Sequence, residues 1–302
     1  MKKFRKITAV VVAFVMLLSM VACNTYSPAK EYKNVTLGDL KLDVRSDMEY
    51  DNTHKNASGE NAEQYYCDYF GVTVTSEKAA LYKLEGYNDI AAYLGCVIEA
   101  NNLDAEVKTS GDRCYMDYKN TVDGVECIYT AYGLELGYSY YMVQFFTVSG
   151  DEEKYRAEYE KIMDTVELAE TPEETVEVVI DDVKMTVSGD AEEDTSGQYY
   201  TGKYTFAAMS EELPGTTAEQ FAKIAIQQGG FKTADGEDVT EPTMLDDDIA
   251  FYEYVDSDET YFYNYMKTID SNIVYILFAT QTEADDTLKS EMEDIVKNAT
   301  LA

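Results

Sequence analysis

The sequence has no tryptophan and only one histidine among 302 residues. It is also poor in positive charge, with 24 lysines and arginines against 58 aspartates and glutamates. The lone histidine, His54, is the one imidazole base that a serine or cysteine nucleophile could use, and it lies in a polar segment away from any such motif. The formal net charge of −34 disfavours nucleic acid and anionic lipid headgroups as partners. We therefore expect a basic or neutral partner and no nucleic acid.

Common motifs of cofactor and metal sites are also missing. The chain has no phosphate-cradling P-loop and no dinucleotide-binding glycine pattern, and one histidine without paired cysteines disfavours zinc. Gly137 and Ser139 lack the second glycine of a nucleophile elbow. We expect no cofactor, no metal site and no enzymatic activity.

Cysteine is confined to the first half of the chain. Besides Cys23, the four cysteines permit three disulfide connectivities, and these residues are Cys67, Cys96, Cys114 and Cys127. A turn expected at residues 122–124 would place Cys127 opposite Tyr118 and Cys114 opposite Ala131, too far apart to bridge. Because the second half builds a similar unit without cysteine, the sequence favours free, mostly buried thiols and leaves disulfides open.

The first 22 residues have the layout of a secretory signal peptide. Four cations among residues 2–6 precede an apolar stretch at residues 7–18, which is shorter than the roughly 20 residues of a membrane-spanning helix. Its removal would make the mature chain more negative by four charges. We expect export from the cytoplasm.

The end of this segment, Met20-Val21-Ala22-Cys23, resembles the lipobox of bacterial lipoprotein precursors, with methionine where leucine is usual. The resemblance implies that Cys23 is acylated and becomes the first residue of a protein held on the extracytoplasmic face of the cell membrane. Residues 23–33 would then form a lipidated, flexible tether.

The rest of the chain predicts a tandem duplication. Apolar residues with the spacing of one helix face end each half at an offset of 133 residues, as in the pairs Tyr155 and Leu288 or Ile162 and Ile295. Strand-like segments repeat upstream, with residues 64–66 matching 198–200 and residues 40–44 matching 183–187. Pro172 lies in the polar hinge between a first repeat domain at 34–170 and a second at 173–302.

Each repeat contains a second, inner helix. In the second copy Thr217 and Gln220 form a capping box, Phe221, Ile224 and Ala225 supply the apolar face, and Gly229-Gly230 ends the helix. In the first copy the inner helix starts at Asn88 and stops at Asn101-Asn102.

We expect an α+β fold, with each repeat an antiparallel sheet covered by two helices. The predicted order is two strands, the inner helix, at least three further strands and the closing helix. This order resembles the PsbP-like fold, and that resemblance implies a non-catalytic accessory or binding role.

Tyrosines alternate along one predicted strand at Tyr261, Tyr263 and Tyr265 and along the preceding strand at Tyr252 and Tyr254. An exposed face of these residues would bind glycan or peptide. The alternative is that the face packs under a helix, which is the commoner use of aromatic residues in sheets.

The acidic runs at 235–238, 246–248 and 256–259 contain oxygen ligands for calcium, yet none has the spacing of an EF-hand loop, and solvated turns are expected. The sequence thus favours a lipid-anchored, non-catalytic two-domain module that binds another envelope or surface protein. Two alternatives stay open: a carboxylate-dependent envelope hydrolase and a calcium-dependent surface binder.

Overall fold

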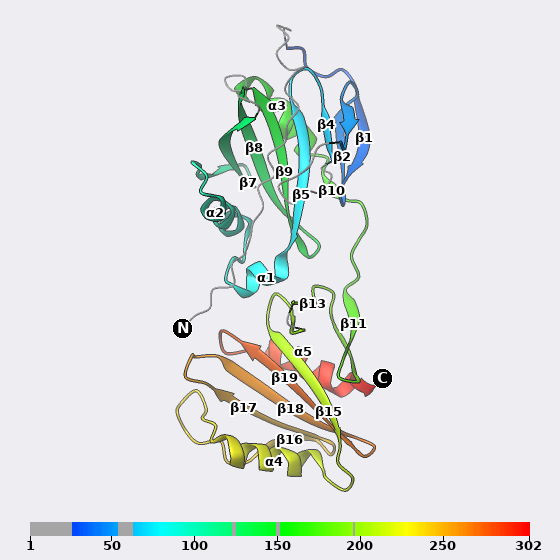
Figure 1. The fold of residues 1–302 in the computed structure, drawn as a ribbon, viewed down its shortest axis with the longest axis vertical. Coiled ribbons are helices and arrows are strands. Elements are labelled where there is room, and N and C mark those ends of the chain that lie inside the picture. Colours follow the sequence, from blue (N-terminus) through cyan, green and yellow to red (C-terminus); the bar gives the residue numbers. More distant parts are fainter. Residues whose placement is uncertain (1–25, 54–62, 123–124, 149–151, 196) are drawn as a thin grey trace. The chain divides into compact units, whose positions relative to one another are not determined.

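The computed structural model describes residues 26–53, 63–122, 125–148, 152–195 and 197–302 (Figure 1). The predicted signal peptide, Cys23 and His54 lie outside these residues. The chain divides into two compact units, unit 1 at 1–172 and unit 2 at 173–302. No helix in the described residues has both the length and the apolar character needed to span a membrane.

Unit 1 has ten strands and three helices in its described residues. They are β1 (Tyr32–Leu37), β2 (Leu40–Arg45), β3 (Glu49–Asp51), β4 (Gln64–Tyr66), β5 (Gly71–Lys78), α1 (Ala79–Leu84), α2 (Ile90–Asn101), β6 (Val107–Ser110), β7 (Arg113–Val122), β8 (Val125–Leu136), β9 (Ser139–Val148), α3 (Glu152–Met163) and β10 (Glu167–Leu168).

Unit 2 repeats this order apart from α1. Its elements are β11 (Thr175–Ile180), β12 (Val183–Ser188), β13 (Glu192–Glu193), β14 (Tyr199–Tyr200), β15 (Thr205–Glu212), α4 (Ala218–Gly229), β16 (Thr243–Asp246), β17 (Ile249–Val255), β18 (Tyr261–Ile269), β19 (Asn272–Thr280), α5 (Asp286–Asn298) and β20 (Thr300–Leu301).

The two units have the same topology. A seven-stranded antiparallel sheet has the order β3-β4-β5-β9-β8-β7-β6 in unit 1 and β13-β14-β15-β19-β18-β17-β16 in unit 2. A three-stranded sheet has the order β1-β2-β10 or β11-β12-β20. The fold is therefore α+β with two similar halves, as the sequence predicts.

Each large sheet has a core on both faces. In unit 1, α2 packs on β7 and β8, and α3 packs on β9 and on β2 of the small sheet. In unit 2, α4 runs along β17 and β18 (Figure 1), and α5 packs on β12. The closing helix and the three-stranded sheet thus lie together on one face of the large sheet.

Local sequence signals explain where the helices begin and end. The Thr217–Gln220 capping box opens α4, and Gly230 closes it in the left-handed conformation, as predicted. The predicted apolar face of α4 is correct for Phe221 and Ala225, which pack against the core beside the buried Ala218, Ala222 and Ile226, and wrong for Ile224, which is 51% exposed. Propensity and caps set the ends of a helix, whereas its contact with β17 and β18 sets the buried face.

The inner helix of unit 1 shows a similar small difference. Asp89, one residue after the predicted start, is the N-cap of α2, and its side chain accepts a hydrogen bond from the Ala92 N–H at 2.8 Å. Asn102 ends α2 in the left-handed conformation. Five strands and the short helix α1, rather than two strands, precede this helix. The strands β3 and β4 were missed because they are too short to show an alternating pattern, whereas β5, with eight residues, was missed despite its length.

The four cysteines among the described residues of unit 1 are free, with Cys67, Cys96 and Cys127 buried and Cys114 partly buried. The predicted register of the β7–β8 hairpin is wrong by two residues, since Cys127 pairs with Asn120 and Cys114 with Gly133. Val122 pairs with Val125, so the connection is tighter than the expected three-residue turn. The two thiols still lie far apart along the hairpin.

Candidate functional site

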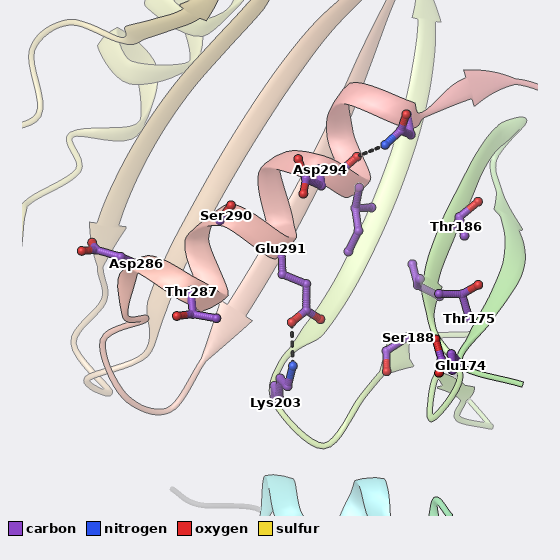
Figure 2. Close-up of a pocket in the computed structure, with 13 residues that line it drawn as sticks. Glu174, Thr175, Thr186, Ser188, Lys203, Asp286, Thr287, Ser290, Glu291 and Asp294 are labelled. Carbon is purple, nitrogen blue, oxygen red and sulfur yellow. Dashed lines mark hydrogen bonds and ion pairs between the residues drawn. The ribbon is translucent and has the colours of Figure 1, made fainter. Parts of the chain in front are cut away.

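A groove of about 1070 Å³ crosses the surface of unit 2 between α5 and the β11–β12 hairpin (Figure 2). Its 13 lining residues are Glu174, Thr175, Thr186, Val187, Ser188, Lys203, Asp286, Thr287, Ser290, Glu291, Asp294, Ile295 and Asn298. Five of them carry hydroxyls, four carry carboxylates and none is aromatic. The groove therefore offers hydrogen-bonding and acidic groups rather than an aromatic platform.

The spacing of residues along α5 places one face in the core and one in the groove. Met292, Ile295 and Val296 are buried in the hydrophobic core of unit 2. Thr287, Glu291 and Asp294 lie three or four residues apart and share the opposite side, as Figure 2 shows. The Asp285 side chain caps the helix by accepting from the Leu288 N–H at 2.8 Å.

Glu291 is the centre of the polar contacts in the groove. Its Oε2 accepts from the Lys203 ammonium at 2.6 Å (Figure 2), and its Oε1 accepts from the Tyr204 hydroxyl at 3.1 Å. Burial of the ring and the neighbouring Glu291 carboxylate raise the pKa of Tyr204. The Glu291 side chain is 26% exposed and remains open to a ligand.

Unit 1 has an equivalent glutamate, but it is covered. Glu158 lies on α3 at the position of Glu291 and its side chain is 1% exposed. Its Oε2 accepts from the Tyr26 hydroxyl at 2.8 Å and from the Ala29 N–H at 3.4 Å. Its Oε1 accepts from the Tyr32 hydroxyl. The chain that covers Glu158 is therefore the segment just before β1.

This segment, residues 26–31, is ordered against unit 1 rather than forming the flexible tether that we expected. The Tyr26 ring packs edge-on against Tyr69 and Tyr155, with centroids 5.5 and 5.0 Å away. The Ser46 N–H donates to the Glu31 carbonyl at 3.0 Å. Polar composition alone predicted a tether, whereas two tyrosines supply enough contact to hold the segment.

Arg45 joins this cluster from the end of β2. Its guanidinium makes a fork with both carboxylate oxygens of Asp47 at 2.9 and 2.7 Å. Its Nη1 donates to the Ser27 carbonyl at 3.0 Å and lies 3.8 Å from Glu158. Arg45 thus holds the covering segment in place through its hydrogen bond to the Ser27 carbonyl.

Burial would raise the pKa of Glu158, but this effect is outweighed. Hydrogen bonds from Tyr32, Tyr26 and the Ala29 N–H, with the charge of Arg45, hold the pKa of Glu158 below its usual value. Burial and the hydrogen bond to Glu158 raise the pKa of Tyr32 to about 12. The cluster is therefore built around an ionised carboxylate and neutral tyrosines.

Matching backbone hydrogen bonds confirm that the two sites are equivalent. The Ser46 N–H bond to the Glu31 carbonyl recurs as Gly189 to Glu174. The Cys67 N–H bond to the Phe70 carbonyl recurs as Thr201 to Tyr204. Three large residues of the unit 1 cluster correspond to other residues in unit 2, and the pairs are Tyr32 with Thr175, Arg45 with Ser188 and Tyr69 with Lys203.

One carboxylate in unit 2 lacks the partner that its counterpart has. Asp190 corresponds to Asp47, and its Oδ2 accepts from the Gly202 N–H at 2.8 Å. Its Oδ1 is buried and has no hydrogen-bond partner among the described residues. Position 188 holds serine where Arg45 stands in unit 1, which accounts for the missing contact.

The five predicted ligand-face tyrosines do not share one face. The strands β17 and β18 pair, but Tyr263 stands opposite Glu253, and Tyr254 stands opposite Phe262. Tyr252 and Tyr254 consequently point to the α4 side, whereas Tyr261, Tyr263 and Tyr265 point to the α5 side.

Three of these tyrosines, Tyr252, Tyr263 and Tyr265, are buried, at 5%, 1% and 1% exposure. Tyr254 is half-buried and stacks on Phe231, with ring centroids 4.2 Å apart. Tyr254, Tyr261 and Tyr263 border a cavity of about 30 Å³, which has room for a few water molecules at most. These side chains form core rather than an open platform.

The acidic runs use their oxygens within their own turns. Asp256 Oδ1 accepts from the N–H groups of Asp258 and Thr260 at 2.9 and 3.0 Å, and Asp238 pairs with Lys232 at 2.8 Å. Across the part of the chain that the structure describes, no three Asp, Glu, His or Cys side chains gather as a metal site would require.

Sequence reasoning missed both glutamates of the equivalent sites. A charged residue on an amphipathic helix is ordinarily a solvated one, and nothing beside Glu158 in the sequence marks it as buried. The available signal was the repeat itself, because the offset of 133 residues that aligns the closing helices also aligns Glu158 with Glu291.

No protein-family model matches the sequence, and no curated protein matches it. A crystal structure from Bacteroides thetaiotaomicron is 15% identical over 47% of this chain, with a TM-score of 0.30. The match spans 50% of that protein, about half of its length.

Two further solved structures are similar at comparable levels. The cyanobacterial PsbP protein CyanoP from Synechocystis is 10% identical over 49% of this chain and 97% of its own, with a TM-score of 0.33. The type VI secretion immunity protein TplEi from Pseudomonas aeruginosa is 11% identical over 89% and 97%, with a TM-score of 0.20. CyanoP is of the PsbP-like kind that the element order resembles, and similarity at this level assigns no function.

Proposed function

We propose that the chain is a non-catalytic binding module held on the outer face of the cell membrane by a lipid on Cys23, and that the groove of unit 2 is its binding site. The observation that supports this proposal is the groove itself, which has a volume of about 1070 Å³ and is lined by the partly exposed Glu291. Another envelope or surface protein is the proposed partner.

The packing of residues 26–31 against unit 1 limits how far unit 1 could lie from a membrane that holds a lipid on Cys23. Two residues separate Cys23 from Tyr26, which is bonded to Glu158. Three extended residues span roughly 10 Å, so a lipid on Cys23 would keep unit 1 close to the headgroups. This proximity favours a partner that also resides at the envelope.

The residue types of unit 2 favour binding over catalysis. Residues 173–302 contain neither histidine nor cysteine, so the groove serines have no imidazole base within the unit. The one lysine in the groove, Lys203, is bonded to Glu291. The alternative of a carboxylate-dependent hydrolase is supported by the four carboxylates that line the groove.

Photo-crosslinking in living cells tests the binding site. A photo-reactive residue at Ser290, which is exposed on the groove side of α5, should form a defined covalent adduct with one partner. The same residue at Ile224, which is 51% exposed on α4, is the control because α4 covers the opposite face of the sheet. Equal adducts at both positions, or none at Ser290, would reject the groove as the binding site.

An activity assay tests the hydrolase alternative. The purified chain and its Glu291→Gln variant are incubated with isolated envelope glycans, and the release of reducing ends is measured. We expect no release from either protein. Release that depends on Glu291 would replace the binding proposal with the hydrolase.

A further inference from the structure

The contrast between the two units indicates what kind of ligand the groove of unit 2 accepts. In unit 1 the equivalent glutamate receives hydrogen bonds from a segment of polypeptide without regular secondary structure, residues 26–31, and lies beside a guanidinium from Arg45. In unit 2, Glu291 stands in place of Glu158 and Asp190 in place of Asp47. The covering segment and the arginine of unit 1 have no counterparts there.

The segment that would cover the groove in unit 2 is held elsewhere. Ala169 corresponds in sequence to Tyr26, and its N–H donates to the Asp39 carbonyl of unit 1 at 2.8 Å. The Ala169 carbonyl accepts from the Lys41 ammonium at 3.2 Å. Because the connecting chain is bonded into unit 1, it leaves the groove of unit 2 open.

The arginine has no substitute among the described residues. Residues 173–302 contain no arginine. The described arginines of unit 1 are all paired, Arg45 with Asp47, Arg113 with Glu160 and Arg156 with Asp117. The remaining arginine, Arg5, belongs to the predicted signal peptide and lies outside the described residues. We therefore expect a guanidinium beside Glu291 and Asp190 to come from another molecule.

We propose that the groove of unit 2 binds an arginine-containing segment of a partner protein. The guanidinium of that arginine would lie beside Glu291 and Asp190, at the position that Arg45 occupies in unit 1. The proposal rests on the proposed function, since it names the class of segment that the groove binds. Three observations support it: the open groove, the peptide-covered equivalent site around Glu158, and the buried Asp190 Oδ1 without a partner among the described residues. Asp190 is not one of the 13 lining residues, but its charge acts on Tyr204, which is bonded to Glu291.

Charge and geometry favour arginine over lysine. Four carboxylates against one lysine make the groove attractive to a cation. A guanidinium presents five donors in a planar fork. Arg45 uses this fork to bond the Asp47 carboxylate and the Ser27 carbonyl while it lies 3.8 Å from the Glu158 carboxylate. The hydroxyls of Thr175, Ser188 and Ser290 remain available to the peptide backbone.

The binding test uses a fluorescent octapeptide, Thr-Tyr-Ser-Arg-Ala-Thr-Tyr-Ser, titrated with the purified full chain and followed by anisotropy. The control peptide carries citrulline, which has the shape of arginine without its charge. We expect the arginine peptide to bind at least about tenfold more tightly than the citrulline peptide. Equal binding of the two peptides, or no binding of either at millimolar concentration, would overturn the proposal.

Three variants locate the interaction. Glu291→Gln should weaken binding of the arginine peptide by about tenfold, whereas Glu212→Gln, which removes the same charge outside the groove, should leave it nearly unchanged. Ser188→Arg recreates the arginine of unit 1 and should abolish peptide binding while the protein stays folded. If Ser188→Arg fails to fold, the Glu291 and Glu212 variants still decide the question.

The outcomes also separate this inference from the proposed function. If Ser290 crosslinks a partner but the arginine peptide neither binds nor competes with that adduct, the groove binds another ligand class and only this inference fails. If neither adduct nor peptide binding is seen, both fail.

Discussion

Glu158 and Glu291 occupy the same position on the closing helices of two similar units, yet Glu158 is buried and Glu291 is partly exposed. The Glu158 side chain is 1% exposed beneath residues 26–31, and the Glu291 side chain is 26% exposed in a groove. The helices are alike, so the difference comes from the segment that precedes each unit. In unit 1 that segment folds back over the glutamate, and in unit 2 it belongs to the preceding unit.

Neutralising the two glutamates should therefore have unequal effects. We expect Glu158→Gln to lower the free energy of unfolding of unit 1 by about 2–3 kcal/mol, because charge-assisted bonds to Tyr26 and Tyr32 are lost and Arg45 loses a nearby charge. Glu291→Gln should cost less than about 1 kcal/mol, because its ion pair with Lys203 is partly solvated.

Thiol labelling measures the effect of Glu158→Gln in unit 1 alone, and a circular dichroism melt of residues 173–302 measures the effect of Glu291→Gln in unit 2. Cys67, Cys96 and Cys127 are buried, and residues 173–302 contain no cysteine, so labelling in urea reports on unfolding of unit 1. A Cys23→Ala, Cys114→Ala background removes the two remaining thiols, because Cys114 is only partly buried. Indistinguishable urea midpoints for Glu158→Gln and the parent would contradict the importance of this cluster.

The stability of unit 1 should also fall at acidic pH. The folded-state pKa of Glu158 lies below its usual value of about 4.3, so its contribution is fully present above that value and is lost as pH falls through the lower folded-state pKa. Urea midpoints between pH 7 and pH 3 should decline less steeply in Glu158→Gln than in the parent. Parallel curves would show that Glu158 is not a source of the acid sensitivity.

The covering segment should be needed for a stable isolated unit 1. A fragment of residues 26–172 should melt cooperatively. A fragment of 34–172 loses Tyr26, Tyr32 and the start of β1, and with them the aromatic contacts of Tyr26, the hydrogen bonds to Glu158 and the Ser27 carbonyl that Arg45 binds. We expect the shorter fragment to be less stable by at least about 3 kcal/mol or to remain unfolded. Residues 173–302 should fold without any such extension, and circular dichroism melts compare all three.

Lipid attachment at Cys23 is testable by metabolic labelling with palmitate. We expect Cys23→Ala to abolish incorporation of the label and to release part of the protein into the medium. Because the residue precedes the packed segment, the variant should keep the melting temperature of the soluble chain. Undiminished labelling would exclude Cys23 as the attachment site.

Calcium should act on this protein only as a general electrolyte. Asp256 and Asp238 already bond within their own turns, so we expect calcium at about 1 mM to raise the melting temperature no more than sodium chloride of equal ionic strength. A larger rise with calcium would support the calcium-dependent binder, and the runs at 246–248 and 256–259 would be mutated first.

The parts of the fold that the sequence predicts are those encoded over a few residues. The capping box at Thr217, the left-handed ends at Asn102 and Gly230, and the spacing of the closing helices were correct because helix geometry relates residues three or four apart. The duplication was visible because the same local patterns recur in the same order.

Strand register was less predictable. The β7–β8 pairing differed by two residues, and Tyr252 and Tyr254 pointed away from the face of Tyr263, because the connecting turns set the register and a shift of one residue exchanges the faces of a strand. Hydrophobic alternation showed that these tyrosines belong to strands without showing what covers them.

The sequence by itself determined two related α+β halves, the closing helices and the acidic, histidine-poor character that disfavours much common chemistry. Only the tertiary structure decided that Glu158 is buried and Glu291 open. That difference depends on residues 26–31 contacting a helix more than 120 positions later in the chain, as in the bond from Tyr26 to Glu158. Contacts of such long range leave no periodic signal in a single sequence, since periodicity reports which face of an element is apolar and not which segment covers it.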